Sequence, residues 1–91
     1  MPDLIKIGGF TGWKAVTAMA AAKTLSVSSN AFVEVSAHAL VATPNAHWHE
    51  YLDKARPVLV DAYDIESGTV CARGPGLGIE WNLAKVAEFT I

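Results

Sequence analysis

The chain has 91 residues, enough for one small domain, with 52% apolar residues, 18% charged residues and a net charge of −2. Its lysines and arginines are scattered, which argues against nucleic-acid binding, and it has neither the apolar start of a signal peptide nor a segment long enough to cross a membrane. The single cysteine, Cys71, excludes an internal disulfide and is expected to be a small core residue of a cytoplasmic protein.

The first third of the chain predicts two strands separated by a helix. The apolar run "LIKI", residues 4–7, is closed by two glycines and predicts a buried strand. Thr11 is the expected cap of a helix over residues 12–24. The apolar positions of this helix, at helical spacing, are Trp13, Val16, Met19 and Ala20. Residues 25–29 predict the second strand.

A second helix and a third strand complete a β-α-β-α-β pattern over residues 1–52, spaced as in a parallel sheet. The helix is expected over residues 31–42, before a Thr-Pro pair. Its apolar stripe is Val33, Ala37 and Leu40. The strand "AHWHEYL", residues 46–52, alternates in character. One face is expected to carry Ala46, Trp48, Glu50 and Leu52, and the other His47, His49 and Tyr51.

Residues 53–91 have a different character and are expected to belong to the same single domain, residues 1–91. A Ser-Gly pair at 67–68 predicts a hairpin turn. The segment "GPGLG", residues 74–78, resembles a phosphate-binding loop, but it does not join a strand to a helix, so a tight turn is favoured. Asn82 is the expected cap of a short last helix.

Histidines close to one another raise the question of a metal site. His47 and His49 lie two apart on the third strand and could reach one ion, with His38 as a third ligand. Ordinary packing is the alternative, because parallel strands are buried on both faces. With no assured third ligand, the pattern favours packing.

Glu50 is the carboxylate with the strongest chemical interest. Apolar neighbours at Trp48 and Leu52 would remove it from water and favour its neutral form. A neutral carboxylic acid can donate a hydrogen bond to an oxyanion that develops during a reaction. The alternative is a strand-end glutamate that points into water. Asp3 and Asn30 also lie near strand ends, and the pattern leaves their relative position open.

Four segments carry a resemblance to a known family. They are "PDLIKIGGFTGWKAV", "SVSSNAFVEVSAHAL", "ATPNAHWHEYLD" and "PGLGIEW". In order and spacing they resemble the C-terminal part of mandelate racemase-like members of the enolase superfamily. The resemblance implies an α/β fold: part of a (β/α) barrel, with about three β/α units (the family's strands six to eight), a C-terminal hairpin and a short helix. It also implies that the hairpin and tail return to the family's N-terminal capping domain.

The resemblance also implies roles for individual residues. Asp3 matches the aspartate that pairs with a catalytic histidine, and Glu50 matches the glutamate that hydrogen-bonds the enediolate oxygen. Ser28 and Ser29 match the serines that precede the histidine. Asn30 stands at the place of the histidine itself, and an amide cannot accept a proton at neutral pH. Asp3, Asn30 and Glu50 are therefore expected to be the remains of a catalytic site.

The family's lysine base and its three magnesium-binding carboxylates come from earlier strands, so no cofactor is expected in this chain alone, although the parent family uses Mg²⁺. The leading hypothesis is a truncated domain without catalysis of its own. The alternatives are a piece of a split or truncated Mg²⁺-dependent racemase or dehydratase acting on hydroxy acids, or a small histidine-based metal-binding module. The sequence leaves open whether Met1 is a true start or a truncation point.

The apolar content is high for a small chain, since typical domains carry about 25% charged residues. Three barrel strands cannot close, and their outer edges leave backbone groups unpaired. We therefore expect something outside these residues to cover the surface. A homo-oligomer, most simply a two-fold dimer, is favoured over a complementing barrel chain.

Overall fold

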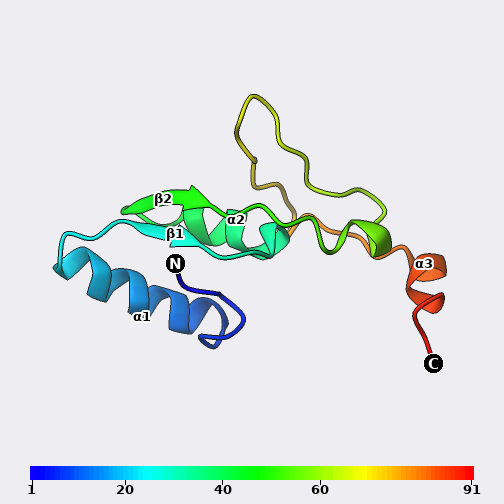
Figure 1. Ribbon diagram of the computed structural model, residues 1–91, viewed down its shortest axis with the longest axis horizontal. Helices are drawn as coiled ribbons and strands as arrows, with labels where there is room; N and C mark the ends of the chain where they lie inside the picture. Colours follow the sequence, from blue (N-terminus) through cyan, green and yellow to red (C-terminus); the bar gives the residue numbers. More distant parts are fainter.

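The computed structural model describes residues 1–91. Its elements are α1 (Gly9–Ala22), β1 (Val27–Ser29), α2 (Val33–Val41), β2 (Ala46–His49), the 3-10 turn η1 (Arg56–Val58) and α3 (Leu83–Ala87). The two strands form a parallel sheet, α2 connects them and packs against them, and α1 lies on the β1 side (Figure 1). The second and third predicted strands, the helices and the parallel pairing are confirmed.

The segment Leu4–Gly8 forms turns, so the prediction of a first strand there is wrong. The carboxylate of Asp3 accepts hydrogen bonds from the backbone N–H groups of Ile5 and Lys6, at 3.0 and 3.2 Å. An aspartate that captures the amides two and three residues ahead favours a turn over an extended strand. Leu4 is nevertheless buried, as the apolar run predicted.

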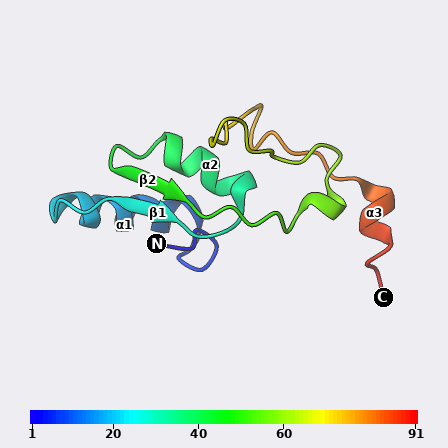
Figure 2. The ribbon, with the colours of Figure 1, turned by 45° about the horizontal axis from the view of Figure 1, so that its top comes forward.

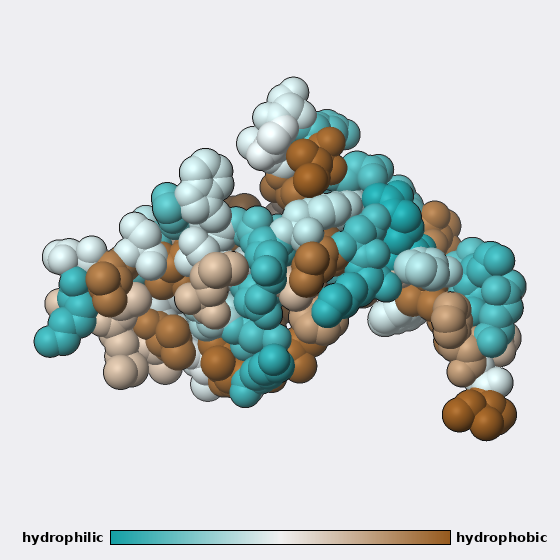
Figure 3. All heavy atoms as spheres, viewed as in Figure 1, coloured by the Kyte–Doolittle hydropathy of each residue, from teal (hydrophilic) through white to brown (hydrophobic).

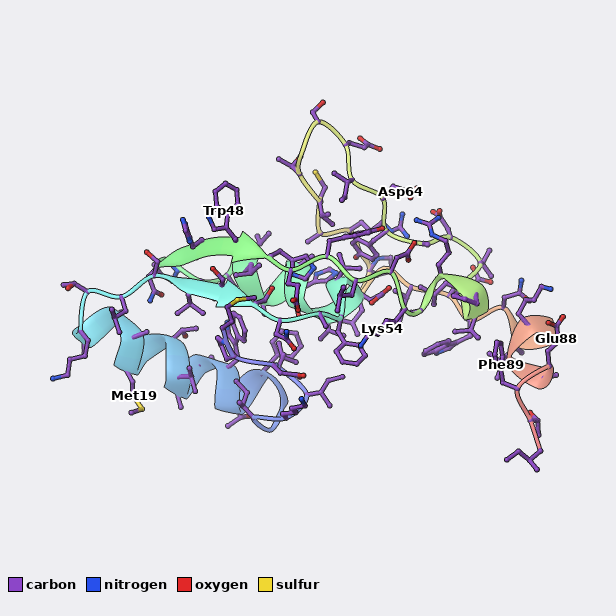
Figure 4. All side chains as sticks on the ribbon, in the orientation of Figure 1. Met19, Trp48, Lys54, Asp64, Glu88 and Phe89 are labelled. Carbon is purple, nitrogen blue, oxygen red and sulfur yellow. The ribbon has the colours of Figure 1, made fainter.

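The helix α1 packs through Trp13, which is only 2% exposed. Its indole Nε1 donates to the hydroxyl of Thr43 at 2.8 Å, and that hydroxyl donates to the carbonyl of Ala39. Two predictions fail here. The helix begins after Gly8, which has a φ of 89°, rather than after Thr11. Met19 is 72% exposed and points away from the sheet (Figure 4), because no layer covers that side of α1.

Two small apolar clusters hold the molecule together. The first joins α1, β1 and α2 through Leu4, Trp13, Val27 and Ala39. The second joins α2 to the C-terminal segment through Val33, Ala37 and Tyr63. Val33 and Ala37 belong to the predicted stripe of the second helix, which is confirmed at these positions. Tyr63 is therefore the buried anchor of the C-terminal segment, residues 59–91, and partly buried residues of that segment pack around the same cluster.

The C-terminal segment follows most of its local predictions. Ser67 and Gly68 form the predicted turn, both with positive φ, between Glu66 and Thr69, which pair as an isolated antiparallel bridge. Residues 74–78 form the expected tight turn, and the side chain of Asn82 accepts from the backbone N–H of Lys85 at 3.1 Å, as a cap. Cys71 is exposed, so its prediction as a core residue is wrong, since the hairpin has no second layer to bury it.

The molecule is elongated, with extents of 46 × 32 × 22 Å and a Cα radius of gyration of 14.2 Å, against about 12 Å for a compact domain of this length. Its accessible surface is 6087 Å², against roughly 5,100 Å² for a compact protein of this mass. The helix α3 stands apart at one end in two views (Figures 1 and 2). Apolar residues lie open along the molecule and at its C-terminal end (Figure 3). None of the helices combines the length and apolar character needed to cross a membrane.

The link from β1 to α2 has an unusual backbone. Ala31 and Phe32 adopt left-handed conformations, with φ of 48° and 44°. Such a conformation costs about 1–2 kcal/mol for a residue with a Cβ atom. The two strained residues directly follow Asn30.

This strain predicts different effects for two buried alanines. Ala31→Gly should relieve about 1–2 kcal/mol of strain, which offsets the loss of its small side chain. Ala37→Gly, inside α2, should lose about 1 kcal/mol of helix propensity in addition to packing. Urea denaturation at one fixed protein concentration measures both variants. Ala31→Gly is expected to be the more stable, and equal losses would contradict the strained conformation.

Candidate active site

Three chain segments converge at the carboxyl ends of the strands. The backbone N–H of Asn30, just after β1, donates to the carbonyl of Pro2 at 3.1 Å. The backbone N–H of Glu50, just after β2, donates to the carbonyl of Ser29 at 3.0 Å. Parallel strands end at a common edge of the sheet, which is where α/β proteins place their ligands. These bonds therefore place Pro2, Asn30 and Glu50 at one edge of the sheet, after the ends of β1 and β2.

Glu50 is held by two hydrogen bonds on one oxygen. The side-chain amide of Asn30 and the backbone N–H of Ala31 both donate to Oε2, the second at 3.2 Å. The expected apolar flank is absent, because Trp48 is 70% exposed and points away from the molecule (Figure 4), and Leu52 is also exposed. Desolvation by these two residues was thus the wrong expectation, since nothing covers that face of β2. Glu50 is half-buried and anchored by N–H donors instead.

Asp3 lies at the same edge, but its carboxylate is used in the turn that follows it. Oδ1 accepts from the N–H groups of Ile5 and Lys6, and Oδ2 lies 3.8 Å from the ammonium of Lys6. These partners belong to its own segment. The structure thus brings Asn30 and Glu50 together by a direct side-chain contact, whereas the carboxylate of Asp3 contacts only its own segment.

Each of the two serines before Asn30 contacts a histidine on β2. Ser29, fully buried, hydrogen-bonds Nδ1 of His49, and Ser28 lies 3.5 Å from Nδ1 of His47. Both pairs cross from β1 to β2, and Ser29 and His49 are also paired in the sheet, whose register shifts between Val27 and Ser29. The serines therefore tie the strands together below the site.

The histidines do not form the metal site that was considered. The Nε2 atom of His38 lies 3.0 Å from the hydroxyl of Tyr63, away from His47 and His49, which are held by their serines. No group of three or more histidine, cysteine, aspartate or glutamate side chains is arranged to bind an ion. The three histidines therefore do not form the three-ligand set expected of such a module, because each ring has a different neighbour.

Burial lowers the pKa of His49 below its ordinary value of 6.5, and the nearby charge of Glu50 offsets part of this effect. The Nε2 atom of His49 is buried without a hydrogen-bond partner. A charged imidazolium in this position would be poorly solvated. The folded protein therefore favours the neutral ring.

We expect the free energy of unfolding to fall as the pH drops below about 6.5. The unfolded chain then binds a proton at His49 more readily than the folded chain does, so the stabilisation is complete above pH 6.5 and is lost as the pH falls through the lowered pKa. Urea titrations between pH 5 and 8 measure the slope, and His49→Gln should flatten it. His47→Gln, at an exposed ring, is the control, and a slope unchanged by His49→Gln would contradict the assignment.

One group at the site, the backbone N–H of Ala31, was not predicted from the sequence. The backbone N–H of Ala31 donates to Glu50, and a main-chain donor leaves no trace in the residue types. The two positive φ values that aim it are also invisible in the sequence, because alanine and phenylalanine rarely adopt them. The contact between Asn30 and Glu50 was not predicted either, because the sequence pattern left the position of Asn30 relative to the strand ends open.

The chain is similar to known proteins over its whole length. The family model described as "Enolase C-terminal domain-like" matches residues 1–86. An enolase from Bradyrhizobium, complexed with magnesium and mandelic acid, superposes with a TM-score of 0.95 at 45% identity over 100% of this chain and 25% of that chain. An enolase from the alphaproteobacterium bal199, with bound magnesium, gives 0.91 at 36% identity over 97% and 24%.

A third solved structure is an L-talarate dehydratase from Polaromonas sp. JS666, complexed with magnesium and L-glucarate. Its TM-score is 0.85 at 25% identity, over 96% of this chain and 25% of that chain. The chain spans about a quarter of the length of these structures. The resemblance carried by the four sequence segments is confirmed, and the small α/β fold with parallel strands matches that family.

Proposed function

The chain belongs to the enolase C-terminal domain-like family, within the mandelate racemase group of the enolase superfamily, and on that premise we propose that residues 1–91 supply the acid side of a barrel active site without catalysing a reaction alone. The observation that carries the proposal is Glu50, anchored at the carboxyl end of β2 by Asn30 and Ala31. A group at this edge faces the place where barrel enzymes bind substrates.

Glu50 suits the role of a hydrogen-bond donor to a developing oxyanion. In its protonated form a carboxylic acid offers one O–H, and a donor fixed before the reaction stabilises the charge that appears in the transition state. The two N–H groups on Oε2 hold the carboxyl in place. The acid is therefore positioned, but it needs a base to act with.

The residues at this edge do not supply that base. Asn30 occupies the place of the family's histidine, and its amide nitrogen is a donor that does not take up a proton at neutral pH. Asp3, which would orient such a histidine, holds its own turn instead. A reaction that needs two bases on opposite sides of the substrate is thus not expected from these residues.

A second candidate is a part in a larger enzyme that acts on hydroxy acids. The relatives favour it, because the solved structures include complexes with mandelic acid and with L-glucarate, both of which are hydroxy acids. The proton acceptor would then come from a part of that enzyme outside residues 1–91. The residues described here do not form a magnesium site, so we assign them no step that runs through a metal ion. One-base proton transfer or dehydration is the chemistry left open to such an enzyme.

The test compares the chain with a chimera. The chain alone, with Mg²⁺ and either mandelate or glucarate, should show no turnover and no exchange of the α-proton with deuterated water. In the chimera, residues 1–91 replace the matching quarter of the Bradyrhizobium protein. We expect the chimera to exchange the α-proton of only one mandelate enantiomer. Turnover by the chain alone, or exchange of both enantiomers, would overturn the proposal.

Glu50→Gln in the chimera isolates the acid. An amide keeps the shape of the side chain but loses the acidic proton, and removal of one such donor costs about 10²–10³-fold in rate. Glu66→Gln, in the exposed hairpin, is the matched control and should leave the rate unchanged. An unchanged rate in Glu50→Gln would remove Glu50 from the mechanism.

We also propose that the chain, when no other polypeptide completes it, pairs with a second copy of itself. The surface beyond that of a compact protein is about 1,000 Å², and a standard interface buries about 800 Å² on each partner. The outer edges of β1 and β2 add unpaired backbone groups. Sedimentation at micromolar concentration should give a dimer, and a compact monomer would contradict this proposal.

A further inference from the structure

We infer that Asn30 is a positioning residue rather than a remnant: together with the backbone N–H of Ala31 it holds Oε2 of Glu50, so that Oε1 alone carries the proton that this acid donates. The inference rests on the proposed role of Glu50 and assigns the task to a particular atom. It also gives a purpose to the amide that stands where the family has a histidine.

The two hydrogen bonds fall on the same oxygen. The amide of Asn30 and the N–H of Ala31 both donate to Oε2, and no protein group donates to Oε1. A protonated carboxyl has one O–H and one carbonyl-like oxygen. Two N–H donors fit the carbonyl-like oxygen and would repel a hydrogen placed on it. The proton of Glu50 therefore belongs on Oε1, the oxygen that the protein leaves open.

The main chain beside Glu50 is fixed from both sides. The N–H of Asn30 is bound by the carbonyl of Pro2, and the carbonyl of Ala31 accepts from the hydroxyl of Ser36 at 3.0 Å. Between these bonds, Ala31 and Phe32 keep their left-handed conformations. This strained link aims the N–H of Ala31 at Glu50, and its cost is the kind of strain that functional sites retain.

An amide has one advantage over an imidazole in this position. The NH₂ group of Asn30 donates at every pH near neutrality, whereas the donor and acceptor roles of a histidine change as it titrates. The anchor on Oε2 therefore persists whether Glu50 is charged or neutral. With asparagine in this position the site loses a proton acceptor and gains a hydrogen-bond donor to Glu50 that does not depend on pH.

The experiment is a pH titration of the 91-residue chain, labelled with ¹³C at glutamate side chains and uniformly with ¹⁵N, followed by NMR. The Asn30 side-chain amide and the Ala31 backbone amide should shift with the same midpoint as the carboxyl carbon of Glu50. The side-chain amide of Asn45, which donates to the carbonyls of Thr17 and Leu25, is the internal control and should not follow that midpoint. Glu50→Gln should abolish the shared transition.

Two further readouts separate positioning from a merely structural role. Below the midpoint the Ala31 amide should remain slow to exchange with solvent, because Oε2 still accepts after Oε1 is protonated. Asn30→Ala should move the resonance of the Glu50 carboxyl carbon and speed solvent exchange of the Ala31 amide, because Oε2 then keeps a single donor. Asn45→Ala, which removes side-chain hydrogen bonds away from the site, should leave the Glu50 transition unchanged.

Three results would overturn the inference. They are an Asn30 side-chain amide whose resonance does not follow the protonation of Glu50, a Glu50 carboxyl resonance that Asn30→Ala leaves unchanged, and an Ala31 amide that exchanges rapidly once Glu50 is protonated. None of these readouts requires turnover. If the chimera fails to exchange the α-proton of mandelate, the proposed function is lost while the NMR result can still stand. If the NMR result fails, the positioning role of Asn30 is lost while the chimera can still be active.

Discussion

Replacement of Trp13 by alanine is expected to lower the free energy of unfolding by about 3–5 kcal/mol. The indole is 2% exposed and lies in the cluster that joins α1 to β1 and α2. The variant loses the packing of the largest side chain in this cluster. It also leaves the hydroxyl of Thr43 without its indole donor. Few small domains have stability to spare for such a loss.

Trp48→Ala is the matched control for this variant. The same change at a side chain that is 70% exposed should alter the free energy of unfolding by about 0.5 kcal/mol or less. Urea denaturation followed by circular dichroism measures both variants without relying on tryptophan fluorescence, and the protein concentration must be equal because association adds to stability. Comparable losses at Trp13 and Trp48 would contradict the position of α1.

Replacement of Tyr63 by phenylalanine should cost about 2–3 kcal/mol. The ring is buried, and its hydroxyl donates to the carbonyl of Leu77 at 2.8 Å and lies 3.0 Å from Nε2 of His38. It also accepts from the backbone N–H of Arg73 at 3.3 Å. Removal of one oxygen leaves several half-buried groups without this partner. The contact with His38 joins this segment to α2, and the bonds with Leu77 and Arg73 hold the segment in its own fold, so the segment should loosen.

Limited proteolysis and urea denaturation test this prediction. Tyr63→Phe should be cleaved faster between η1 and α3 than the unaltered chain. Tyr51→Phe, whose hydroxyl donates to the single carbonyl of Tyr63, is the control and should lose only about 1 kcal/mol. If both variants resist the protease equally, the hydroxyl of Tyr63 does not hold the segment in place.

Local signals in the sequence predicted local structure well. The cap at Asn82 and the turn at Ser67 depend on side chains and backbone preferences within a few residues, and both are confirmed. The strand expected over residues 4–7 failed because Asp3 takes the amides that a strand would need. Burial was harder to predict, since Cys71 and Met19 are exposed only because no neighbouring layer covers them.

For the candidate site, too, some features were predictable from the sequence and others were not. The family resemblance assigned Asp3, Asn30 and Glu50 to one vestigial site, whereas the strand pattern left the position of Asn30 open, and the structure brings Asn30 into contact with Glu50. The apolar flank expected at Trp48 was inferred from alternation along one strand, which gives the direction of a side chain but not what lies above it. The donor at Ala31 depends on backbone torsions that its residue type does not indicate.

The direct pairing of β1 with β2 has a kinetic consequence. Parallel neighbours need a crossover, and here one short helix supplies it within about two dozen residues, so closing this loop costs little entropy. We expect the β1–α2–β2 unit to form early as the nascent chain folds and to be the last part to open. Because Asn30 lies inside this unit and Glu50 directly follows it, their contact should form before the N-terminal and C-terminal segments have folded.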